Sequence, residues 1–124
     1  MKKKSVSQLK KIADKAFSIF IRKRGVDFKE YNTCYTCGLK RHWKELQCGH
    51  FISRAHSITR YDPANSRPQC PNCNIWRRGT YAEYAQPLIA EIGLKKFNAL
   101  VEKGRQMHQF TVKELEEIIN KYSC

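Results

Sequence analysis

Residues Cys34-Tyr-Thr-Cys37 and Cys70-Pro-Asn-Cys73 are two Cys-x-x-Cys pairs, and they decide how this chain folds. Each pair can close a tight turn that directs both sulfurs at one ion. Four thiolates at about 2.3 Å complete a tetrahedral zinc site with no open position. Such a site joins two distant segments of the chain and does no chemistry itself. We therefore predict one structural zinc ion, bound by Cys34, Cys37, Cys70 and Cys73.

Other roles for the cysteines fit the pattern less well. Buried free thiols or a redox pair would also use four cysteines, but two such pairs in a reducing compartment are typical of metal ligands. Cys48 and His50 could instead complete a site with the first pair, which would leave the second pair without a role. The terminal Cys124 is expected to be a bystander.

The charge of the chain indicates the class of its partner. The 124 residues carry a net charge of +13, and a polyanion is the natural ligand for such a surface. Residues 1–24 contain nine Lys or Arg against one Asp, residues 38–80 contain eight against two acids, and residues 81–124 contain six of each. The basic surface is therefore predicted on the N-terminal part and on the cysteine-rich centre.

No stretch of the sequence has the hydrophobic length of a membrane span, about 20 apolar residues. The opening Met1-Lys-Lys-Lys resembles the start of a signal peptide, but no long apolar run or cleavage site follows it. We expect a cytoplasmic protein without a membrane partner, and cysteines in the cytoplasm stay reduced.

Apolar spacing predicts a basic helix at the start of the chain. Ser5 and Gln8 can form a capping box. Apolar residues from Leu9 to Phe20 then recur on one helical face, with the basic residues mostly off it. Gly25 can end the helix.

The rest of the chain divides into an irregular centre and a helical end. Residues 26–80 are rich in Cys, Gly, Pro and Asn, which predicts loops, a short hairpin and metal-bound turns. Helices are predicted at residues 81–92, with a break near Pro87, and at residues 94–103. A last helix should follow the cap Thr111.

The segment between the cysteine pairs carries a second pattern. It reads Leu46-Gln-Cys-Gly-His50-Phe-Ile-Ser-Arg54, then Arg60-Tyr-Asp-Pro-Ala-Asn65, then Gln69-Cys-Pro-Asn-Cys-Asn74. His50, Asn65 and Asn74 stand at intervals of 15 and 9 residues. This segment resembles the HNH nuclease motif. From about residue 31 to about residue 105, the order of motifs resembles that of the phage NinG/Rap recombination proteins.

The resemblance implies a role for each of these three residues. Hydrolysis of a phosphodiester needs an activated water and a cation at the scissile phosphate. His50, at the end of the first hairpin strand, would be the general base. Asn65 would fix the hairpin loop and orient the histidine. Asn74, held in place by the adjoining ligand Cys73, would offer its side-chain oxygen to Mg²⁺ or Mn²⁺.

One position departs from the family pattern. In many HNH nucleases the residue before the general base is an Asp or His that binds the catalytic metal, and here it is Gly49. Arg78, four residues after Asn74, cannot bind a cation either. Asp62 is the candidate for an additional ligand, with His56 as another. As a residue before proline, Asp62 fits an ordinary turn equally well.

Arginine is suited to phosphate, because it forms two parallel hydrogen bonds and keeps its charge. Trp43 and Trp76 are predicted to pack around the zinc site, with stacking on unpaired bases as the alternative. A solvated basic face is the alternative to DNA contact for the cations. The predicted DNA-binding residues are Arg54, Arg60, Arg67, Arg77 and Arg78 near the motif and Lys10, Lys11 and Lys15 on the first helix.

These observations predict an α+β protein of one domain, residues 1–124. It would comprise a basic helix (1–25), a zinc-stapled ββα-metal (HNH) centre (26–80) and a helical C-terminal part (81–124). The resemblance implies metal-dependent cleavage of branched DNA, such as Holliday junctions or D-loops, during phage recombination in the cytoplasm of the bacterial host. It leaves a homodimer open.

Two functions without catalysis compete with this interpretation. A zinc-containing DNA-binding module needs only the charge and the four cysteines. An RNA-binding zinc protein of the ribosomal kind is disfavoured by the neutral C-terminal third of the chain. His50 and Asn74 distinguish the enzyme from both, because a binding module does not need them.

Overall fold

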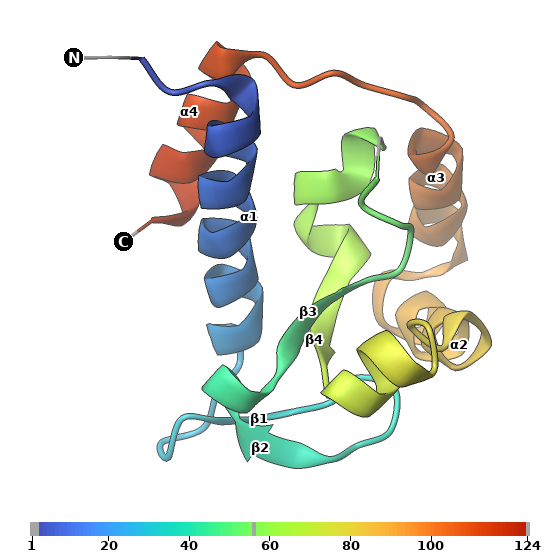
Figure 1. Ribbon diagram of the computed structural model, residues 1–124. Coiled ribbons are helices and arrows are strands. Elements are labelled where there is room, and N and C mark those ends of the chain that lie inside the picture. Colours follow the sequence, from blue (N-terminus) through green and yellow to red (C-terminus); the bar gives the residue numbers. More distant parts are fainter. Residues whose placement is uncertain (1–2, 56, 124) are drawn as a thin grey trace.

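Two helices at opposite ends of the sequence lie side by side in the computed structural model, which describes residues 3–55 and 57–123 (Figure 1). They are α1 (Val6–Lys23) and α4 (Val112–Tyr122). Capping boxes begin both helices, at Ser5 and at Thr111, because each hydroxyl accepts from the N–H three residues later. Both predicted helices are thus confirmed. His56 and Cys124 lie outside the described residues.

The largest hydrophobic core lies between these two helices. One face of α1 is buried at intervals of four residues, which brings its apolar side chains into a single stripe. The stripe packs against α4 and against Tyr61 from the centre of the chain. The buried members of this core are Leu9, Ala13, Phe17, Ile21, Tyr61, Leu115 and Tyr122.

The centre of the chain contains two short antiparallel hairpins, where the sequence predicted one. β1 (Tyr31–Thr33) pairs with β2 (Lys40–His42), and β3 (Gln47–His50) pairs with β4 (Ser66–Gln69). Figure 1 shows α1 and α4 on one side of the β3–β4 hairpin and α2 and α3 on the other. The hairpin therefore connects the two helical parts of the molecule.

A single turn of π-helix, η4 (Asn72–Trp76), follows β4 and leads into α2 (Tyr81–Ile92). Pro87 lies inside α2 without breaking it, so the predicted break is wrong. The missing N–H of Pro87 frees the carbonyl of Glu83, and Glu83 is exposed to water.

Gly93 ends α2 at a φ of 88° and is followed directly by α3 (Leu94–Gly104). The two helices share a small core with Phe51 of the centre. The mixture of helices and small sheets confirms the predicted α+β class. Within the described residues, no helix combines the length and the apolar character needed to cross a bilayer.

Candidate metal centre and the adjoining His50 pocket

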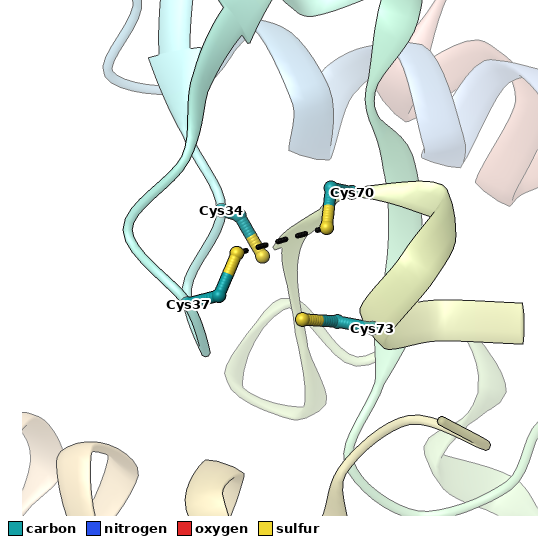
Figure 2. Close-up of side chains that lie close together, drawn as sticks. All are labelled: Cys34, Cys37, Cys70 and Cys73. Atoms are coloured by element: carbon teal, nitrogen blue, oxygen red, sulfur yellow. Dashed lines mark hydrogen bonds between the residues drawn. The ribbon is translucent and has the colours of Figure 1, made fainter. Parts of the chain in front are cut away.

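The four cysteines converge from two distant parts of the chain. Cys34 and Cys37 lie in the turn after β1, whereas Cys70 and Cys73 follow β4 and enter η4 (Figure 2). Their four sulfurs all lie within 4.8 Å of one another, and the Cys37 and Cys70 sulfurs are 3.7 Å apart. Zinc–sulfur bonds of about 2.3 Å in a tetrahedron put the sulfurs about 3.8 Å apart. The donor set and its spacing therefore fit a zinc ion.

The backbone of each turn supports this arrangement. The N–H of Gly38 donates to the carbonyl of Cys34, and the N–H of Asn74 donates to the carbonyl of Cys70, both at 2.9 Å. Burial by itself raises the pKa of the Cys34 thiol. Hydrogen bonds from the backbone of Cys70 and from the side chain of Thr36 are among those that together lower this pKa to about 6. A thiolate is the form that binds metal.

The alternative zinc site with Cys48 and His50 does not form, because neither residue belongs to this cluster. Cys48 instead packs at the edge of the α1–α4 core, where burial raises the pKa of its thiol to about 11. The four cysteines predicted from the sequence are the ones that meet.

His50 ends β3, and one hydrogen bond decides which of its ring nitrogens carries the proton. Its Nε2 lies 2.9 Å from the carbonyl oxygen of Arg60. A carbonyl can only accept, so Nε2 donates and the lone pair of the neutral ring resides on Nδ1. Burial lowers the pKa of His50, and the neighbouring charge of Arg54 adds to this effect. The ring is therefore neutral at neutral pH, as a general base must be.

Asn65 is fully buried and closes the loop between β3 and β4. Its Oδ1 accepts from the N–H of Ile52 at 2.8 Å, and its Nδ2 donates to the carbonyls of Ile52 and Thr59. Thr59 directly precedes Arg60, whose carbonyl holds the His50 ring. Asn65 thus fixes the loop segment that leads into Arg60, and the Arg60 carbonyl is the group that bonds to the His50 ring.

Asn74 lies in η4, directly after Cys73 of the cysteine cluster. Its Nδ2 donates to Oε1 of Gln47 at 2.8 Å. No residue that the structure describes donates to its Oδ1, so this oxygen is available to a cation. The cysteine cluster and β3 thus hold Asn74 from two sides.

His50 and Asn74 line one pocket of about 430 Å³ between α1, β3 and η4, called the His50 pocket below. Arg54 and Arg78 also line it, and both are exposed. The structure therefore brings together the predicted base, the predicted cation ligand and two of the predicted phosphate-binding arginines.

A family model described as "Bacteriophage Lambda NinG protein" matches residues 1–124. The chain belongs to the NinG family. Protein ninG of Escherichia phage 933W is 31% identical over 113 residues, which cover 90% of this chain and 53% of that relative. For protein ninG of Escherichia phage lambda the identity is 29%, with 90% and 52% covered. The chain thus spans about half the length of these relatives. No solved structure matches it significantly.

The His50 pocket contains one carboxylate, Asp14, that the sequence pattern did not single out. Asp14 of α1 lines the His50 pocket, and the Arg60 guanidinium binds both of its oxygens. Arg54 lies 3.6 Å from the same carboxylate. Asp14 was the one acid among nine basic residues at the start of the chain, a signal that could have drawn attention to it.

Asp62, the carboxylate predicted as an additional cation ligand, takes no part in lining this pocket. Its Oδ1 accepts from the N–H of Ala64 at 3.0 Å, which caps a short 3₁₀ turn. Its Oδ2 accepts from Nζ of Lys103 at 2.8 Å. The structure therefore gives Asp62 the role of a turn residue.

Gly49 has a steric reason to be glycine. A Cβ at this position would lie 2.0 Å from Oε1 of Gln69. The Gln69 side chain cannot easily move, because it is buried and donates to Thr36 and to the carbonyl of Gly79. The position before His50 therefore has no room for the Asp or His that many HNH nucleases carry there.

The predicted DNA-binding arginines fall into two groups. Arg67 is buried and binds Glu91 at 2.9 Å as well as main-chain carbonyls, so the expectation that it contacts DNA is corrected. Arg60 is engaged by Asp14, and its side chain is 14% exposed. The exposed members are Arg54, Arg77 and Arg78, of which Arg77 pairs with Glu83.

The prediction that both tryptophans pack around the zinc site is also corrected. Trp76, at the end of η4, is 80% exposed. Trp43 is half-buried, with the cations of Arg22 and Lys23 about 5 Å from its ring. It therefore packs against the end of α1. Of the predicted lysines, Lys11 and Lys15 are exposed and Lys10 is half-buried.

Proposed function

We propose that this chain is a metal-dependent endonuclease of the HNH type that hydrolyses phosphodiester bonds in branched DNA during phage recombination. Holliday junctions and D-loops are the branched substrates implied by the resemblance of its motifs. The observation that carries the proposal is the His50 pocket. It combines a neutral histidine whose lone pair lies on Nδ1, an amide oxygen to which no described residue donates, and a rim of arginines.

In the proposed reaction, Nδ1 of His50 accepts the proton of a water that attacks the scissile phosphorus. The carbonyl of Arg60 stabilises the charge that the ring gains, because it accepts from Nε2 throughout the transfer. Asn65 maintains this geometry by fixing the loop that carries Arg60. General-base catalysis of this kind contributes about 10²- to 10⁴-fold in rate.

Asn74 is the proposed protein ligand of a catalytic Mg²⁺ or Mn²⁺. Its oxygen chemistry suits these hard cations, which commonly keep several waters and bind substrate phosphate directly. When bound, such a cation stabilises charge on the phosphate and on the leaving oxygen. Arg54 and Arg78, on the rim of the pocket, would bind the other phosphate oxygens.

The test is to separate cutting from binding with His50→Ala. Wild type and variant are incubated with a linear duplex, a nicked duplex and a four-way junction, with and without Mg²⁺ or Mn²⁺. We expect the wild type to cleave the junction in the presence of cation. His50→Ala should lose at least about 100-fold in cleavage rate, with DNA affinity and zinc content unchanged.

His108→Ala is the matched control, because His108 pairs with Glu114 away from the pocket. This variant should retain wild-type cleavage. Full cleavage by His50→Ala would contradict the proposed base, and loss of zinc from it would make His50 structural. A wild type that binds DNA but never cleaves would favour a non-catalytic zinc module. Tighter binding of structured RNA would favour the RNA-binding alternative.

A further inference from the structure

A second hollow of about 440 Å³ adjoins the His50 pocket. The two share Ser53, Arg78 and Gly79 as well as His50 itself. Val101 and Gly104 of α3 also line this hollow, as does Arg105 directly after the helix. A group whose phosphate occupies the His50 pocket would therefore extend directly into this space, which has the size of a small-molecule site, about 300–1,000 Å³.

Two aromatic side chains line one wall of this hollow. The rings of Phe51 and Tyr81 are stacked, with centroids 4.6 Å apart and an angle of 16° between their planes. Phe51 is buried and also packs against Tyr84 and Phe97. Tyr81, by contrast, is 61% exposed. The core thus supports an aromatic ring that remains open to the solvent.

The turn beside Tyr81 carries positive charge in a strained conformation. Arg78, Gly79 and Thr80 have φ values of 53°, 85° and 51° in succession. Left-handed backbone is uncommon outside glycine, and such strain concentrates at functional sites. Gln69 holds this turn by donating to the Gly79 carbonyl at 3.1 Å. The Arg78 side chain is thereby placed on the rim of both hollows.

We propose that this second hollow is a nucleobase subsite, in which an unpaired base beside the scissile phosphate stacks on Tyr81. The position of that phosphate rests on the proposed function. Arg78 and Arg105, which both line this hollow, would bind the flanking phosphates. The base must be unpaired, because neighbouring pairs cover both faces of a base within a duplex. Forks and D-loops supply such bases at their branch points.

The experiment measures binding without divalent cations, so that it does not depend on cleavage. Three fluorescein-labelled DNAs are compared by anisotropy with zinc-loaded protein: a fork with unpaired thymines, the same fork with abasic residues at those positions, and a fully paired duplex. Stacking contributes a factor of about 5 to 150 in affinity per base. We therefore expect Tyr81→Ala to weaken binding to the thymine fork about tenfold and binding to the duplex hardly at all.

Two comparisons make the result specific. Tyr81→Phe keeps the ring and should bind like the wild type, and Tyr31→Ala removes a different exposed ring and should also leave the fork preference intact. Replacing the thymines with abasic residues should weaken DNA binding by the wild type. It should not weaken binding by Tyr81→Ala any further, because the base and the ring contribute to the same stacking interaction. Equal loss on the fork and the duplex, or a wild type indifferent to the missing bases, would overturn the subsite. If His50→Ala keeps the fork preference but the wild type never cleaves, the proposed enzyme fails and the subsite stands.

Discussion

The α1–α4 pair and the cysteine centre are stabilised by different forces. Seven buried side chains fill the core between the two helices, and all but Tyr61 come from those helices themselves. The buried cluster at the centre consists of Leu46 and three cysteines. Apolar burial contributes about 25 cal/mol per Å², so the first region has a hydrophobic source of stability that the second lacks. We therefore predict that a metal ion held by the four cysteines would provide most of the stability of the centre.

The His50 pocket lies where these two regions meet. α1 contributes Asp14 and Ser18, which are one helical turn apart, and the centre contributes His50 and Asn74. The pocket therefore depends on both regions at once. Loss of either the metal or the α1 packing should disturb it, for different reasons.

The largest expected effect comes from removing a zinc ligand. Cys73→Ser should unfold residues 31–80, because metal binding contributes about 10–16 kcal/mol in small zinc domains. Elemental analysis should find one zinc per wild-type chain and almost none in the variant. Hydrogen exchange should show protection lost first in the two hairpins. Cys48→Ser is the matched control and should retain zinc, since Cys48 lies outside the cluster. If the zinc-free protein kept normal hydrogen-exchange protection in the two hairpins, metal binding would not be what stabilises the centre.

A smaller effect is expected from the hydrophobic region. Leu115→Ala opens a cavity against α1 and should lower the free energy of unfolding by about 2–5 kcal/mol in a denaturant titration. Zinc content should be unchanged, because Leu115 belongs to the other core. The exposed Leu94 provides the control, and Leu94→Ala should change stability by less than about 0.5 kcal/mol. Release of zinc by Leu115→Ala would show that the two regions are coupled.

The smallest effect concerns the outer surface of α1. Lys11→Gln combined with Lys15→Gln should leave stability unchanged and weaken binding to DNA of every shape. Each phosphate contact contributes about 0.9 to the slope of log affinity against log salt, so the slope should fall by up to about 2. As a control, Lys113→Gln combined with Lys121→Gln removes two exposed charges from α4. This double variant should hardly change the slope. Equal slopes for the wild type and the α1 variant would remove this helix from the DNA-binding surface.

Several features of the chain could be predicted because they depend on neighbouring residues. The capping boxes at Ser5 and Thr111 need only four residues each, and both occur as expected. The NinG relationship also followed from motif order, and the family match confirms it. The β1–β2 hairpin was missed because its strands are three residues long, too short for a recognisable alternation.

The predictions for Arg67 and Trp76 were wrong because they concerned burial, which depends on contacts between distant segments. Arg67 reads as a surface cation, yet Glu91, 24 residues later, binds it in a buried position. Trp76 reads as a core residue, yet the turn of η4 leaves it on the surface. In both cases burial depends on what packs against the side chain, and its own residue type does not settle this.

The sequence by itself determined the four cysteines of the metal centre, because Cys-x-x-Cys spacing brings two sulfurs together within one turn wherever it occurs. It also determined the helices of both ends, since their caps and apolar faces are local. Only the tertiary structure decided which residues surround His50. Asp14 reaches the pocket because α1 docks against β3, and Gly49 is glycine because Gln69 fills its space. Contacts between segments far apart in the chain leave no periodic pattern in it, so only their packing reveals them.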